Sequence, residues 1–187
     1  MIKRLLLIGL LMLPFAAWGF IKPVRLVAPE LAGLTCLNNI ICTDEPSRFT
    51  EATKLYEDSL QFVEASVAKV AHKPRVIFCA TDTCFKSFGF DRAAAKTIGT
   101  YGIVISPRAW LPYYVRHEMI HHLQFEQLGN LKAWLVTPQW FMEGMAYSLS
   151  EDPRSKLSEP LEHYRSQFKV WYSQVGRERL WTEAERL

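Results

Sequence analysis

The sequence predicts an α+β fold in which short strands come first and helices follow. Two segments rich in β-branched and aromatic residues, 75–79 (RVIFC) and 100–106 (TYGIVIS), are predicted strands. Apolar residues then recur at helical spacing over about 111–128, 138–149 and 158–174. Hydrophobic residues make up 49% of the 187-residue chain and charged residues 22%, a composition that supports a folded core and excludes a disordered chain.

The remaining elements follow in chain order. Residues 20–46 read as an irregular lead-in with three prolines and two cysteines. A helix is predicted from Ser47, which can cap it, to the residue before Lys73-Pro74, because a residue preceding proline is pushed away from helical angles. Segment 79–84 reads as a turn, and 85–100 shows no clear pattern. Thr137 is a predicted cap with Pro138 at the first helical position, and a last short helix is expected over 178–185.

The N-terminus has the pattern of a targeting segment. A positive region, 1–4, precedes an almost pure Leu and Ile run, and Ala17 and Gly19 stand where a signal peptidase reads small residues. Cleavage after Gly19 is the favoured reading, and an uncleaved anchor over the 17 uncharged residues 5–21 is the alternative. Both place a single domain, 20–187, outside the cytoplasm, either periplasmic or secreted, and the second keeps it near a membrane.

The charge balance indicates no nucleic-acid partner. Lys3 and Arg4 belong to the targeting segment, and without them the formal charge falls from +3 to +1. The rest of the chain contains no cluster of basic residues, which nucleic-acid binding would favour. Nothing in the sequence indicates an oligomeric state.

Four cysteines in an exported chain predict disulfides. The local pairing, Cys36 with Cys42 and Cys79 with Cys84, closes two short loops and is preferred over the other two pairings. A four-cysteine zinc site is the alternative, although the usual C-x₂-C spacing is missing.

The most informative stretch is HEMIHH, 117–122. On a helix, His117 and His121 lie one turn apart on one face and can reach the same zinc ion. Glu118 is rotated off that line, so it can act as general base toward a zinc-bound water. Apolar neighbours such as Met119 and Ile120 indicate a buried helix, where unpaired polar groups would be costly.

A third zinc ligand is expected from the next helix. Gln124 and Gln127 stand where a metzincin would carry Gly and His, so that pattern fails. Glu143 is the only acidic residue of the apolar stretch 138–150, which makes it the candidate ligand. Gly144 beside it would permit close approach of a neighbouring helix.

HEMIHH followed by WFMEGMA resembles the gluzincin metallopeptidases, in the small peptidase MA-like form. The resemblance covers about residues 100–150. It implies a compact zincin-like domain, with a small twisted sheet packed on an active-site helix, then a glutamate helix and C-terminal helices. It also implies one Zn²⁺ per chain, bound by His117, His121 and Glu143, with Glu118 as general base. The strand before the active-site helix would be the sheet edge that pairs with peptide substrate, through Tyr101, Gly102, Ile103 and Val104.

Some roles stay open. Tyr147 stands where thermolysin-like members carry an Asp that orients a zinc-bound His, so this partner is unassigned and Asp152 is a weak candidate. The 21 residues between His121 and Glu143 form a somewhat longer gap than in aminopeptidase-like gluzincins, and the loop 129–137 is expected to accommodate the difference. The candidates for stabilising an oxyanion are Tyr147, His163, Tyr164 and Tyr172. His122 is expected to be a neighbour rather than a ligand, and His72 to be exposed.

The leading hypothesis is zinc-dependent peptide hydrolysis, in which zinc-bound water attacks a peptide carbonyl. The alternative is a non-catalytic, zinc-containing binding or assembly module of the cell envelope on the same scaffold. A structural protein at the membrane surface is a third hypothesis, motivated by the apolar N-terminus. Replacing Glu118 by Gln discriminates the first two, because only a peptidase depends on the general base.

Overall fold

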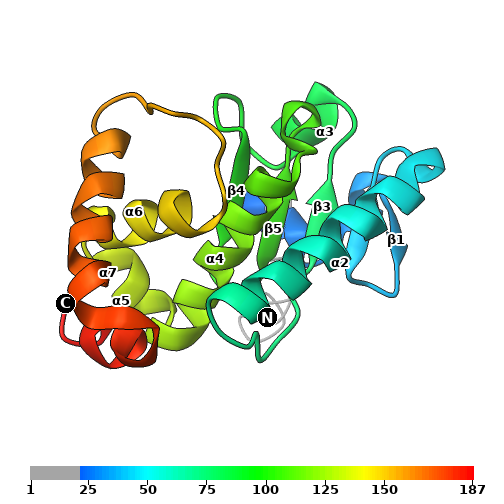
Figure 1. The fold of residues 1–187 in the computed structure, drawn as a ribbon. Helices are drawn as coiled ribbons and strands as arrows, with labels where there is room; N and C mark the ends of the chain where they lie inside the picture. The colour runs from blue at the N-terminus through cyan, green and yellow to red at the C-terminus, as the bar shows by residue number, and fades with distance from the viewer. Residues whose placement is uncertain (1–21) are drawn as a thin grey trace, which may run out of the picture.

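The computed structural model describes residues 22–187 (Figure 1). The predicted signal peptide or anchor lies outside the described residues. The elements in chain order are η1 (Lys22–Leu26), η2 (Pro29–Ala32), β1 (Thr35–Leu37), β2 (Ile41–Thr43), η3 (Pro46–Arg48), α2 (Phe49–Ser66), β3 (Val76–Phe78), α3 (Asp82–Ser87), β4 (Ala95–Ile98), β5 (Gly102–Ile105), η4 (Pro107–Ala109), α4 (Pro112–Leu128), α5 (Asn130–Leu135), α6 (Gln139–Leu149) and α7 (Leu161–Ala184). This arrangement confirms the predicted α+β class.

The five strands form one mixed sheet in the order β1-β2-β3-β5-β4. The three inner strands run parallel, and the outer strands β1 and β4 pair antiparallel with β2 and β5. The prediction that the strand at 101–106 forms the sheet edge is wrong, because β5 is paired on both sides. All four of its residues are buried, as expected of a strand inside a sheet. The edge strands are instead β1 and β4, and β4 lies in the segment 85–100 that showed no clear pattern.

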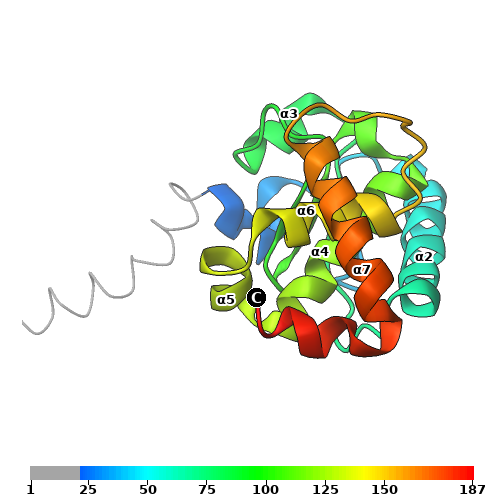
Figure 2. The same ribbon diagram turned by 60° about the vertical axis from the view of Figure 1, so that its left-hand side comes forward.

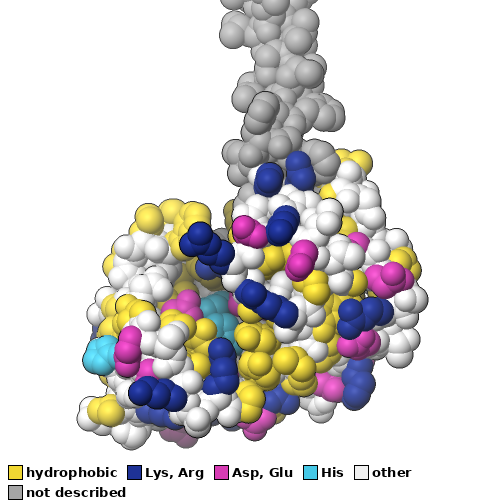
Figure 3. Space-filling view, turned by 90° about the horizontal axis from the view of Figure 1, so that it is seen from above, with side chains coloured by type: hydrophobic (Ala, Val, Ile, Leu, Met, Phe, Trp, Pro, Cys, Tyr) yellow, Lys and Arg dark blue, Asp and Glu magenta, His cyan; other side chains and the backbone are white. Residues whose placement is uncertain are grey.

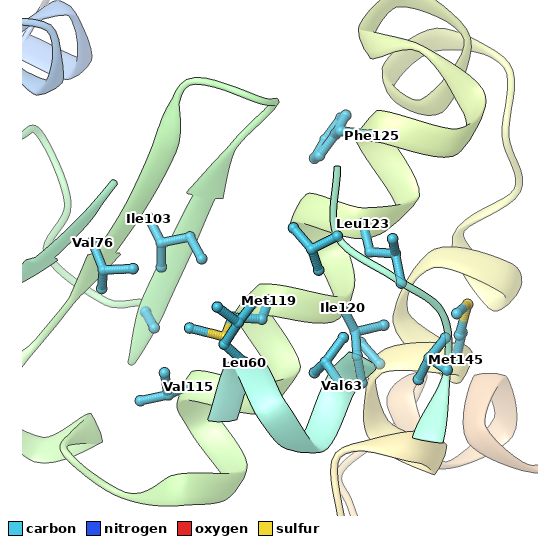
Figure 4. Packing of buried hydrophobic residues seen from close by; sticks show 14 of the residues in the cluster. Leu60, Val63, Val76, Ile103, Val115, Met119, Ile120, Leu123, Phe125 and Met145 are labelled. Atoms are coloured by element: carbon cyan, nitrogen blue, oxygen red, sulfur yellow. The ribbon is translucent and has the colours of Figure 1, made fainter. Parts of the chain in front are cut away.

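Helix α4 lies at the centre of the core and contacts both the sheet and α2 (Figure 4). It is apolar on the sides that face these neighbours, where Val115, Met119 and Ile120 are 0–1% exposed. Figure 4 shows Met119 beside Leu60 and Ile120 beside Val63 of α2, with Val76 and Ile103 of the sheet to one side. Burial of so many large side chains fixes where α4 lies, and α4 carries the HEMIHH motif.

Helices α6 and α7 pack closely because of one glycine. A Cβ at Gly144 would lie 2.3 Å from the carbonyl oxygen of Tyr164 and 2.8 Å from the Cβ of Phe168. The predicted close approach at Gly144 is therefore confirmed, and the neighbouring helix is α7. This packing holds α6, and with it Glu143, against the rest of the helical layer.

Both predicted disulfides are present. Cys36–Cys42 joins directly paired residues of β1 and β2, and Cys79–Cys84 joins the end of β3 to α3. The other pairings and the four-cysteine zinc site are therefore wrong, since a disulfide sulfur is not a thiolate ligand. Two disulfides fit a protein of an oxidising compartment, extracellular or periplasmic.

Several helix and strand boundaries in the structure differ from the predicted ones. The first long helix ends at Ser66, although Val67 and Val70 beyond it stay buried, so apolar spacing there reflects packing rather than helix. The predicted turn 79–84 contains the start of α3, and the predicted loop 129–137 contains α5. The two C-terminal helices are confirmed as α7, interrupted at Gly176 (φ 72°). Among residues 22–187, no helix is long and apolar enough to cross a membrane.

Candidate metal centre

Three predicted ligands converge at one point. His117 and His121 lie one turn apart on α4, and their Nε2 atoms are 3.1 Å from each other. The Glu143 carboxylate on α6 completes the group, 3.6 Å from each Nε2. One ligand atom from each residue lies within 4.8 Å of the others. Two nitrogens on one tetrahedral zinc, each bonded at about 2.0–2.1 Å, are about 3.3 Å apart, so the group has the size of a zinc site.

The protonation of His121 can be read from its partners. Gln124 is fully buried, and its amide nitrogen donates to the carbonyl oxygen of Met142 (3.0 Å). Its oxygen Oε1 therefore faces the Nδ1 of His121 (2.8 Å) and accepts a hydrogen bond from it. With its proton on Nδ1, a neutral His121 directs the lone pair of Nε2 at the group. Lone pairs and carboxylate oxygens that converge in this way repel one another unless a proton or a cation lies between them. The three side chains fit a zinc ion at this place.

The pKa values of His121 and Glu143 also reflect how close these two side chains lie. Burial alone would lower the pKa of His121, but the nearby Glu143 carboxylate outweighs it and raises that pKa. Burial would raise the pKa of Glu143, but the two histidines outweigh it and hold that pKa far below its usual range. Glu143 therefore stays ionised at neutral pH, in the form that binds a metal ion.

The predicted general base has a partner that the sequence did not indicate. Glu118 is 6% exposed, lines the same cleft and does not belong to the converging group. The hydroxyl of Thr97 on β4 lies 2.7 Å from a carboxylate oxygen of Glu118 and 2.8 Å from its backbone oxygen. A donor at this place fixes the position of the carboxylate.

The centre lies in a cleft of about 510 Å³ bounded by α4, α6 and the edge strand β4. Figure 3 shows histidine and acidic side chains at the bottom of a hollow on this face. The N–H of Ser106 bonds to the oxygen of Ala94, and bonded pairs alternate along an antiparallel ladder. Ala95 and Thr97 therefore direct their backbone N–H and C=O groups away from β5, and within the described chain no strand pairs with that side.

The residues predicted to bind substrate through a strand edge lie elsewhere. Tyr101 is 66% exposed in the turn before β5, while Gly102, Ile103 and Val104 are buried inside the sheet. None of them lines the cleft. Their strand-forming residues indicated burial between neighbours and not an edge, which is why this prediction failed.

The four oxyanion candidates separate into two groups. Tyr147 and Tyr164 line the cleft, whereas His163 is exposed and Tyr172 stacks on Phe168 away from it. The ring of Tyr147 packs against that of His117, with centroids 4.4 Å apart. Burial, aided by the Glu143 charge, raises the pKa of Tyr147 to about 12. Its hydroxyl therefore keeps its proton at neutral pH and remains a hydrogen-bond donor.

The other polar neighbours have structural partners. Asp152, the weak candidate for a partner of a histidine, lines the cleft and binds the guanidinium of Arg154 (2.8 and 3.1 Å). The side chain that hydrogen-bonds His121 is that of Gln124. His122 points to a different neighbour, with its Nε2 donating to the backbone oxygen of His72 (2.8 Å). The side chain of His72 is 88% exposed, as predicted. Tyr113 and Tyr114 also line the cleft, and nothing in their spacing indicated this.

The fold and the site define the class: an α+β protein with a candidate three-ligand metal centre at the edge of its sheet. No protein family matches the chain, and no curated protein or solved structure gives a significant match.

Proposed function

We propose that this chain is a zinc-dependent peptidase of the gluzincin type that acts outside the cytoplasm. The observation that carries the proposal is the convergence of two histidine nitrogens and a carboxylate, with His121 oriented by Gln124. Two histidines and one glutamate form a ligand set that leaves a coordination position open for chemistry. The two disulfides fit the proposed compartment.

Each residue of the cleft has a distinct part in this proposal. A bound zinc ion would supply Lewis-acid chemistry and make water more acidic. Glu118, held by Thr97, accepts a proton from the attacking water and passes it to the leaving amine. The hydroxyl of Tyr147 donates a hydrogen bond to the oxygen on which negative charge develops.

An extended peptide can bind along β4. The outward N–H and C=O groups of Ala95 and Thr97 offer a ladder to an added strand, and both residues line the cleft. Since Thr97 also holds Glu118, a peptide paired with this edge would have its backbone close to the general base. The predicted substrate is therefore a peptide or protein segment in extended conformation.

The test begins with the metal. We expect purified protein to bind one equivalent of zinc, measured by elemental analysis, and His117→Ala with Glu143→Ala to lose it. His163→Ala is the matched control, because this histidine is exposed and outside the cleft. Zinc retained undiminished by the double variant, or no stoichiometric zinc in the wild type, would refute the proposed centre.

Catalysis is tested separately with Glu118→Gln. On a peptide library analysed by mass spectrometry, this variant should keep its zinc and lose cleavage, while Glu57→Gln, an exposed position on α2, should cleave like the wild type. Cleavage by Glu118→Gln at the wild-type rate would sink the peptidase mechanism. Stoichiometric zinc with no cleavage by the wild type would favour the binding or assembly module.

A further inference from the structure

Helix α5 presents its apolar side chains outward. Leu131, Trp134 and Leu135 are 75%, 76% and 75% exposed, the highest values among the large hydrophobic side chains of residues 22–187. The helix faces the core through Ala133, which is 2% exposed. A surface helix usually buries its large apolar residues and exposes its polar ones, so α5 is inverted. An exposed apolar patch of this kind marks an interaction site.

The exposure is built into the fold. The side-chain oxygen of Asn130 accepts from the N–H of Thr100, and its amide nitrogen donates to the hydroxyl of Thr100, both at 3.0 Å. Lys132 binds the backbone oxygen of Glu185, and Thr137 closes the helix by bonding to the oxygen of Lys132. These contacts hold both ends of α5, so its apolar residues cannot simply turn inward.

The exposed apolar surface continues toward the start of the described chain. Val136 follows α5 and is 62% exposed, and Tyr101, next to the Thr100 that binds α5, is 66% exposed. A Cβ added at Gly102, next to Tyr101, would lie 2.7 Å from the side chain of Leu26 in η1, so η1 packs close to the start of β5. Val27 and Leu31 beyond η1 are 67% and 71% exposed. We call Leu131, Trp134, Leu135 and Val136 the apolar ridge.

The position of η1 indicates what covers the ridge. Figure 2 shows α5 and η1 on the same side of the molecule. The described chain begins there, at Lys22, directly after the uncharged residues 5–21, a stretch of a length and composition suited to lipid. A bilayer that holds this stretch before cleavage, or permanently, therefore lies on the side from which the ridge projects.

We propose that the apolar ridge docks on the surface of a lipid bilayer. Tryptophan and leucine favour the boundary between headgroups and acyl chains. The chain after residue 19 carries a formal charge of only +1, and Lys132 in α5 is already bound within the fold, so the attraction is apolar and insensitive to salt. Trp134 also lines the cleft, so docking brings the cleft rim to the membrane surface. This docking needs no catalysis, and its test stands apart from that of the proposed function.

The test uses the exported form as the cell produces it, with intact mass showing whether the N-terminal segment remains. It is mixed with vesicles of phosphatidylethanolamine and phosphatidylglycerol that contain brominated acyl chains, which quench tryptophan on contact. We expect quenching of the wild type to exceed that of Trp134→Phe, at low and high salt alike. The difference isolates Trp134 from Trp18 and the other tryptophans.

A second set of variants separates lipid from other occupants. The triple change Leu131→Ser, Leu135→Ser and Val136→Ser should abolish the quenching due to Trp134, whereas Val170→Ser, at a position on α7 as exposed as Val136, should not. Equal quenching of the wild type and Trp134→Phe overturns the proposal. Sedimentation that instead shows a dimer lost in the triple variant, without lipid quenching, assigns the ridge to a second copy and overturns it as well.

Discussion

Gln124 offers a sharp test of how the candidate centre is built. It binds His121 with one end and the backbone of α6 with the other, and it is fully buried. The change Gln124→Met keeps the length of the side chain and removes both hydrogen bonds. Nδ1 of His121 then loses its acceptor, and the imidazole is free to rotate or to exchange its proton between the two nitrogens.

The expected magnitudes follow from these two bonds. Loss of a partner that orients a metal-bound histidine typically costs 10- to 100-fold in metal affinity, about 1.4–2.7 kcal/mol. The metal-free protein also loses stability, because the buried Nδ1–H of His121 is left unpaired and the carbonyl of Met142 loses its second hydrogen bond, at about 1–3 kcal/mol in total after the gain from a more apolar side chain. Both effects arise from one residue that contacts no metal in the proposed arrangement.

Zinc affinity is measured by competition with a chromophoric chelator, and stability by urea unfolding of the metal-free protein. Gln127→Met is the matched control, since this residue lies on the same helix and is exposed. We expect the control to bind zinc like the wild type. A dissociation constant for Gln124→Met within about threefold of the wild type, in a folded protein, would refute the orienting role.

Three further predictions follow from the same region. Thr97→Val should lower the rate of peptide cleavage about tenfold without changing zinc content, and Thr97→Ser should restore it, because only the hydroxyl holds Glu118; a rate equal to wild type contradicts this. Gly144→Ala should reduce the free energy of unfolding by about 1–3 kcal/mol in urea, since its Cβ meets backbone atoms of α7; unchanged stability would be the contrary result. In metal-free protein the raised pKa of His121 contributes stability below its unfolded value of about 6.5, and the lowered pKa of Glu143 contributes above about 4.3. The melting temperature should therefore rise as the pH falls from about 8 to about 6, and Glu143→Gln should flatten that dependence.

The candidate centre was predictable because its geometry is mostly local. The spacing of His117 and His121 fixes their relation on any helix, and a single carboxylate in an apolar segment requires a partner. The structure brings Glu143 to them as expected. Gln124 carried a similar signal, since it is a polar residue three positions after His121 within an otherwise apolar surface. The sequence alone could not show that α6 supplies the carbonyl that fixes its orientation.

The edge strand and α5 were not predictable for opposite reasons. Segment 95–98 (AKTI) begins with two weak strand formers, Ala95 and Lys96, and a lysine is common on an edge, whereas the strongest strand signal, at 102–105, marks a strand buried between neighbours. Segment 130–135 has apolar residues at helical spacing, but it is short and its apolar face is exposed. The rule that the apolar face of a helix is buried therefore could not predict where this helix lies. In both cases tertiary position, and not local propensity, decided the outcome.

The placement of α4 makes the proposed chemistry testable without unfolding the protein. One side of this helix packs Met119 and Ile120 into the core, and the adjacent side presents His117 and His121 to the cleft. The proposed ligands are held by core packing that contains no metal, and two disulfides add to the stability of the fold. A chelator should therefore remove zinc and leave a folded domain, unlike a zinc finger, in which metal binding supplies the folding free energy. Loss of cleavage on chelation would then show that zinc is needed for the reaction, and not that the protein has unfolded.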